Sequence, residues 1–121
     1  MYEASYLKND CLPERYRTEM YIESIDNVTS YSSHQQGLKF AVSVLNLCGE
    51  PVYKSEVELV ISAPDGSKRS LSQLTDSQGV AMFELSGIDN GRWEAVVFRV
   101  EHPEYDMSRN NHNQRWSITY V

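Results

Sequence analysis

This sequence has few cysteines, few prolines and no long apolar run. Two cysteines in 121 residues are too few for the disulfide framework of a small secreted scaffold. The best apolar run, residues 40–47, is interrupted by Ser43 and Asn46 and is much too short to span a bilayer. We therefore expect no membrane insertion.

A signal peptide is also missing, because the first residues have neither a basic region nor an apolar one. If the chain were a complete gene product, this absence would favour the cytoplasm. The last residues alternate like a strand up to Val121 and leave no tail, which is typical of a domain cut from a longer polypeptide. We therefore expect an excised domain.

The chain lacks an excess of positive charge. Eleven Lys and Arg stand against 17 Asp and Glu, so the net charge is −6. Nucleic-acid binding needs clustered basic residues, and the close basic pairs here are only Arg15 with Arg17 and Lys68 with Arg69. We expect no nucleic-acid partner.

The two cysteines leave two alternatives open. A bridge between Cys11 and Cys48 would close a loop of about 37 residues and add about 4 kcal/mol in the chain-entropy model. The other alternative is two unrelated thiols, one of them in a tail.

What the sequence does contain is apolar–polar alternation, interrupted by turn signals about every ten residues. No segment of ten or more residues shows the 3.6-residue period of a helix. Residues 1–17 are polar and aperiodic, which predicts a tail or linker. Residues 18–121 predict one all-β domain, an antiparallel β-sandwich of about seven strands.

The alternation predicts which side chains face the core. In the first strand, Met20, Ile22 and Ser24 share one face, opposite Tyr21, Glu23 and Ile25. In the next two strands we expect the following residues to point inward: Phe40, Val42, Val44, Val57, Leu59 and Ile61. In the strand after residues 76–79, Ala81, Phe83 and Leu85 alternate with Val80, Met82 and Glu84.

The last two strands are unusually apolar. Residues 92–102 carry apolar side chains on both faces, which is typical of a central strand or of one whose outer face is covered. One face holds Trp93, Ala95 and Val97, and the other holds Val96, Phe98 and Val100. In the final strand Trp116, Ile118 and Tyr120 are in step, and we expect both Trp93 and Trp116 in the core.

No catalytic residue is predicted. The sequence has no Gly-x-Ser-x-Gly elbow, and nothing places a serine beside His34, His102 or His112. Glu56 and Glu58 lie two apart on one strand face, and we interpret them as a solvated edge that resists strand pairing.

One loop contains residues that can bind metals. His102, Glu104, Asp106 and His112 would suit zinc, and Asp106 with Asn110, Asn111 and Asn113 would suit calcium. No established metal-binding spacing is present, so the alternative is a polar loop with local hydrogen bonds. We predict no metal and no other cofactor.

Carbohydrate binding would need exposed aromatic side chains on one surface. The candidates are Tyr31, Tyr53, Trp93, Tyr105 and Trp116. Asn27-Val-Thr29 is a formal glycosylation sequon, which we interpret as coincidence.

Several short motifs follow one another in a definite order between residues 20 and 121. They are Met20-Tyr-Ile22, Val42-Ser-Val-Leu-Asn-Leu-Cys-Gly-Glu-Pro-Val52, Val57-Glu-Leu59, Thr75-Asp-Ser-Gln-Gly79, Val100-Glu-His102, Tyr105-Asp106 and Asn111-His112. This order resembles the immunoglobulin-like accessory domains of secreted and surface bacterial proteins, relatives of carboxypeptidase-regulatory-like modules. Many such domains carry a cysteine pair where this chain has Gln73 and Ala81.

The resemblance implies an Ig-like sandwich that is a non-catalytic accessory or spacer module, outside the cell, in a larger bacterial protein such as a hydrolase. Its partner would be a neighbouring domain of the same polypeptide or another protein surface. The alternative function is a module that binds carbohydrate or another surface through loop aromatics.

Overall fold

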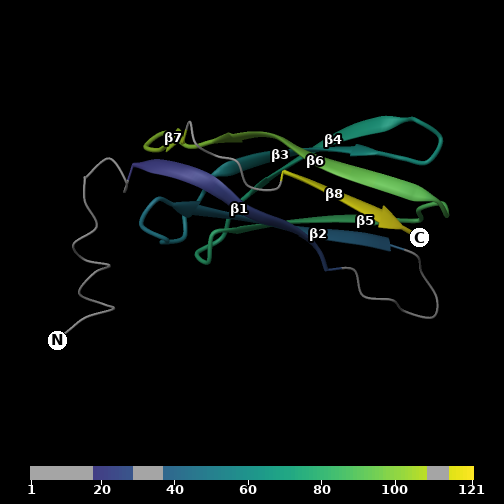
Figure 1. The fold of residues 1–121 in the computed structure, drawn as a ribbon, viewed down its shortest axis with the longest axis horizontal. Coiled ribbons are helices and arrows are strands. Elements are labelled where there is room, and N and C mark those ends of the chain that lie inside the picture. Colours follow the sequence, from purple (N-terminus) through teal and green to yellow (C-terminus); the bar gives the residue numbers. More distant parts are fainter. Residues whose placement is uncertain (1–17, 29–36, 109–114) are drawn as a thin grey trace.

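The computed structural model describes residues 18–28, 37–108 and 115–121, which form two four-stranded sheets (Figure 1). The strands are β1 (Glu19–Asn27), β2 (Gly37–Asn46), β3 (Glu56–Ser62), β4 (Lys68–Leu74), β5 (Val80–Ser86), β6 (Arg92–Glu101), β7 (Asp106–Met107) and β8 (Trp116–Tyr120). One sheet has the order β5-β2-β1-β7 and the other β4-β3-β6-β8. The inner faces of both sheets share one hydrophobic core, so the predicted β-sandwich is confirmed. The predicted tail, residues 1–17, lies outside the described residues.

The alternation of β2, β3 and β5 was predicted correctly. All six side chains expected to point inward from β2 and β3 are buried, and the face of β5 that carries Ala81, Phe83 and Leu85 is buried as well. β6 is central in its sheet, as its two apolar faces indicated, and Trp93 is buried with its indole N–H donating to the carbonyl of Asp89 at 2.9 Å. The short β7 was not predicted, and it pairs with β1 in parallel, unlike the other strand pairs described.

Two β-bulges make the simple alternation wrong in β1 and β6. The register of β1 shifts between Ile22 and Ser24, which turns Ile25 into the core. The register between β3 and β6 also shifts, so that Phe98 and the residue after it are both exposed and Val100 is buried. An extra residue in one strand reverses the face of everything that follows it, which is why Ile25 and Val100 do not lie on the faces that simple alternation assigned to them.

Glu56 and Glu58 do not protect an edge, because β3 lies between β4 and β6. This prediction was wrong.

The turn motifs, by contrast, have the expected geometry. The buried Asn46 accepts the backbone N–H groups of Cys48 and Glu50 at 2.9 Å each, which holds the turn after β2 in place.

The Thr-Asp-x-x-Gly turn joins β4 to β5. Thr75 is buried, and its hydroxyl donates to the carbonyl of Val52 at 2.6 Å and accepts the N–H of Ser55 at 2.8 Å. The Asp76 carboxylate accepts two further backbone N–H groups of the turn, at 2.8 and 3.1 Å. The motif therefore fixes both the turn itself and the segment beside it.

The prediction for the last strand was wrong. Trp116, Ile118 and Tyr120 are 52%, 42% and 72% exposed, while Ser117 and Thr119 point inward and are buried. Asn27 of β1 donates a side-chain hydrogen bond to the Thr119 hydroxyl at 2.8 Å, so the inward face of β8 is partly polar. The apolar face of this strand is on the outside of the sandwich.

Candidate functional site

The exposed apolar side chains of β6 and β8 gather on the outer face of the β4-β3-β6-β8 sheet. We call this surface the outer apolar patch, and it consists of Val60, Val96, Phe98, Trp116, Ile118 and Tyr120. The strand register places Val60, Val96 and Trp116 side by side across three strands. Cross-strand neighbours of this kind lie about 5 Å apart, so the patch is continuous.

Phe98 extends this patch along β6. Regular alternation places Phe98 on the same face as Val96 while Val97 stays in the core, and the bulge acts only after Phe98, where it exposes Arg99 and buries Val100. Phe98 is 63% exposed, although it is among the most apolar side chains of the sheet. A phenylalanine in this position has no role in the core of the domain.

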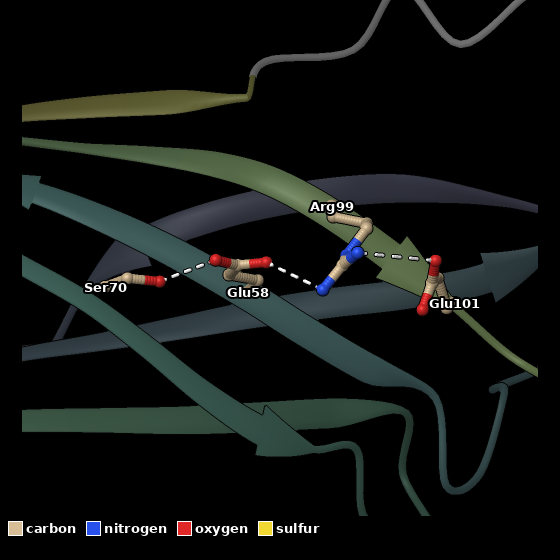
Figure 2. Close-up of polar contacts among 4 residues, drawn as sticks. All are labelled: Glu58, Ser70, Arg99 and Glu101. Atoms are coloured by element: carbon tan, nitrogen blue, oxygen red, sulfur yellow. Dashed lines mark hydrogen bonds and ion pairs between the residues drawn. The ribbon is translucent and has the colours of Figure 1, made fainter.

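A polar network of Glu58, Ser70, Arg99 and Glu101, drawn in Figure 2, borders the patch, because Ser70 is paired with Val60 and Arg99 follows Phe98 in β6. The Ser70 hydroxyl donates to Glu58 at 2.6 Å, and Glu58 forms an ion pair with Arg99 at 3.1 Å. Arg99 also lies 3.7 Å from the Glu101 carboxylate. An apolar centre with a charged border is the usual arrangement of a protein–protein interface.

The outer face of the other sheet is different. Across β2 and β5, Lys39 and Glu84 lie 3.9 Å apart as an exposed ion pair, followed by Ala41 beside Met82 and Ser43 beside Val80. Met82 is the only large hydrophobic side chain of β2 and β5 that is exposed. The apolar exposure of the sandwich is therefore one-sided.

A second concave surface lies at one end of the sandwich. An open hollow of about 680 Å³ is lined by Lys54, Leu74, His102, Tyr105 and neighbouring residues, and it adjoins a hollow of about 640 Å³ that includes Tyr53. Tyr53 is 55% exposed, so two of the aromatic residues considered for carbohydrate binding lie close together here.

His102 is held in place by its own surroundings. One ring nitrogen lies 2.9 Å from the carbonyl of Tyr53, and the other accepts the N–H of Glu104 at 3.0 Å. The Tyr105 ring packs edge-on against the imidazole with centroids 4.7 Å apart. Both nitrogens are thus engaged in hydrogen bonds that order the loop, which leaves the ring no lone pair for a metal in this arrangement.

The structure does not gather the metal candidates into a site. Among residues 18–28, 37–108 and 115–121, no three His, Cys, Asp or Glu side chains are placed to hold a metal ion. His34, His112, Asn110, Asn111, Asn113 and Tyr31 lie outside the described residues. Of the remaining aromatic candidates, Trp93 is in the core and Trp116 belongs to the outer apolar patch.

Sequence reasoning missed Phe98, Ile118 and Tyr120 as surface residues. The useful signal was the double-sided apolar pattern of residues 92–102, which indicated that the outer face of this sheet is unlike an ordinary solvated one.

Comparison with known proteins adds no further assignment: no family model, no curated protein and no solved structure matches this chain. The described part of the chain also contains no helix with the length and apolar character needed to cross a membrane.

Proposed function

We propose that this chain is a non-catalytic, immunoglobulin-like accessory module that docks through its outer apolar patch onto a protein surface. The natural partner is a neighbouring domain of the same polypeptide. The observation that carries the proposal is the exposure of Val96, Phe98, Trp116, Ile118 and Tyr120 on a single sheet face. Monomeric soluble proteins rarely expose a large contiguous apolar patch unless it binds something.

The chemistry of the patch favours a protein partner. Tryptophan, tyrosine and phenylalanine are enriched at the centres of protein interfaces, because each buries a large area at low entropic cost. The acidic and basic groups of the Glu58–Arg99 network would form the border, where solvated charges set orientation rather than affinity.

An extracytoplasmic location accompanies this proposal. Cys48 is disulfide-bonded, and disulfides persist mainly in oxidising compartments. The other cysteine of the sequence, Cys11, lies outside the described residues. The resemblance to accessory domains of secreted bacterial hydrolases supports the same location and the assignment of catalysis to another domain.

The first test is the reading frame that surrounds this segment. A flanking catalytic domain behind a signal peptide is the expected result, and a start codon at Met1 with a stop codon after Val121 would overturn the proposal.

The second test measures binding of the purified flanking domain by calorimetry. Phe98→Lys should weaken the affinity by about 30-fold, the effect of an interface hot spot. Ser72→Lys is the matched control, since it adds the same charge to an exposed polar position on β4 of the same sheet. Equal affinities for the two variants would refute docking through the patch.

A second candidate function is carbohydrate binding at the end hollow, which the adjacent Tyr53 and Tyr105 favour. Titration with β-1,4-linked glucose and N-acetylglucosamine hexamers, monitored by tyrosine and tryptophan fluorescence, tests it. Saturable binding that Tyr53→Ala removes would support this function. If no binding is detected up to about 1 mM sugar, carbohydrate recognition at this hollow is refuted.

A further inference from the structure

The outer edge of β8 has an uncommon combination of properties. In the β6–β8 pair, Gly91 and Val121 exchange both backbone hydrogen bonds, at 3.1 and 2.9 Å, and Val97 donates to the carbonyl of Arg115 at 2.7 Å. Because hydrogen-bonded and non-bonded pairs alternate along an antiparallel ladder, Ser117 and Thr119 also bond to β6. The N–H and C=O groups of Ile118 and Tyr120 therefore point away from β6.

Among the described residues, β8 pairs with β6 alone. The three other sheet edges each carry a feature that discourages further pairing. β4 begins with the charged Lys68 and Arg69, β5 carries the exposed Glu84, and β7 has only two residues. β8 has no charge, no proline and no bulge in its pairing, so it lacks the protection that edge strands usually have.

The sequence of β8 is also chemically symmetric. Trp-Ser-Ile-Thr-Tyr reads aromatic, hydroxyl, isoleucine, hydroxyl, aromatic in either direction. An antiparallel copy of the strand centred on Ile118 would place Ile118 opposite Ile118, Ser117 opposite Thr119, and Trp116 opposite Tyr120. Each side chain would meet one of its own kind, and aromatic cross-strand pairs stabilise antiparallel sheets.

The geometry points to a second copy of this chain as the occupant of the β8 edge, paired antiparallel about a two-fold axis at Ile118. The two Ile118 residues would exchange a pair of N–H···O=C bonds, and the two sheets would join into one of eight strands. Such an interface is isologous, as in most homodimers.

Electrostatics permits this arrangement although the chain carries a net charge of −6. The charged neighbour of Ile118 on the outer face is Glu94 of β6. In the dimer the two Glu94 residues would be three strand spacings apart, about 14 Å, which exceeds the screening length of about 8 Å in physiological salt. Repulsion between the copies is therefore small at this edge.

The pairing is independent of the proposed docking function. It uses the backbone edge of β8, whereas docking uses the side chains of the outer face, which stay exposed when edges join. Joining the edges would make the two outer apolar patches continuous across the two-fold axis. A five-residue strand pair buries little area, so we expect a weak dimer that forms at high protein concentration.

Two measurements on the intact chain test the pairing. Sedimentation equilibrium from about 10 µM to 1 mM should show the mass rising from 13.9 kDa towards twice that value. Amide exchange should slow with concentration at Ile118 and Tyr120, while Ser117 and Thr119, which bond to β6, are protected at every concentration. A constant mass over this range, or exchange at Ile118 that ignores concentration, would overturn the proposal.

Variants locate the contact. Ile118→Pro removes an N–H that points away from β6, so the monomer keeps its ladder, and the dimer dissociation constant should rise at least tenfold. Ile118→Lys keeps the N–H but places two like charges opposite each other across the dimer axis, so the dissociation constant should rise by a similar factor. Because the two substitutions perturb the monomer in different ways, a loss of the dimer in both variants is not explained by misfolding. Phe98→Lys is the control, since it changes the same face away from the edge and should leave dimerisation unaltered. A dimer that persists in both Ile118 variants, or that Phe98→Lys abolishes, would place the interface elsewhere.

Discussion

Gly79 is a position where a single added methyl group should strongly destabilise the fold. Its backbone has φ +78°, a conformation that side chains disfavour, and a Cβ there would lie 2.6 Å from the Val44 carbonyl oxygen and 3.0 Å from the Pro51 Cβ. The Gly79 carbonyl also accepts the N–H of Val44 at 2.8 Å, which joins the turn to β2. The turn therefore cannot move away from the collision without losing that hydrogen bond.

Gly87 is a matched control. It has φ +64° and no atom within 4 Å of the Cβ position, so Gly87→Ala carries the backbone strain without the collision. Backbone strain of this kind costs about 1–2 kcal/mol. Forcing an extra carbon into a closely packed site costs about 1–3 kcal/mol more. We expect Gly79→Ala to lower the free energy of unfolding by about 2–5 kcal/mol and Gly87→Ala by about 1–2 kcal/mol.

Urea unfolding of both variants, followed by tryptophan fluorescence, measures the difference. The effect of replacing glycine on the unfolded chain is common to both variants, so it cancels in the comparison. If the two free energies agree within about 0.5 kcal/mol, the Val44 contact does not explain why glycine occupies this position.

Three further predictions concern other parts of the chain. Thr75→Val leaves the N–H of Ser55 and the C=O of Val52 without the hydroxyl that binds both. The free energy of unfolding, measured by urea denaturation, should therefore fall by about 2–4 kcal/mol. Thr75→Ser keeps the hydroxyl and should keep most of the wild-type stability. Reduction of the disulfide of Cys48 should lower the same quantity by about 4 kcal/mol if its loop is the 37 residues to Cys11, as denaturation with and without dithiothreitol would show. Hydrogen bonds from the hydroxyl and the N–H of Ser67 lower the pKa of Asp65. The ionised Asp65 therefore contributes to stability above the ordinary aspartate pKa, and this contribution is lost as the pH falls through the lower pKa of the folded state. NMR of the Asp65 carboxyl should show a lowered titration midpoint, and Ser67→Ala should raise that midpoint.

Most of the fold could be predicted because β2, β3 and β5 alternate without interruption. Where every second residue is apolar and the strand is paired on both sides or closed by a tight turn, one face must be buried. The same reasoning failed at Ile25 and Val100, because a bulge inserts one residue and no pattern in the sequence marks its position.

The candidate site was the least predictable part. Alternation in β8 separates Trp116, Ile118 and Tyr120 from Ser117 and Thr119, but it does not say which group faces inward. Hydropathy favoured the aromatic face, and the structure buries the hydroxyl face instead, where Asn27 reaches Thr119.

The sequence by itself determined the all-β class, the turns and the inward faces of the regular strands, because these depend on local periodicity and on residues such as Gly79 that suit a special backbone conformation. Only the tertiary structure decided which face of β8 is exposed, where the bulges lie and which strands are edges. These features depend on pairing between segments far apart in the chain. Both the exposed patch and the position of β8 at the edge of its sheet, among the described strands, follow from that pairing.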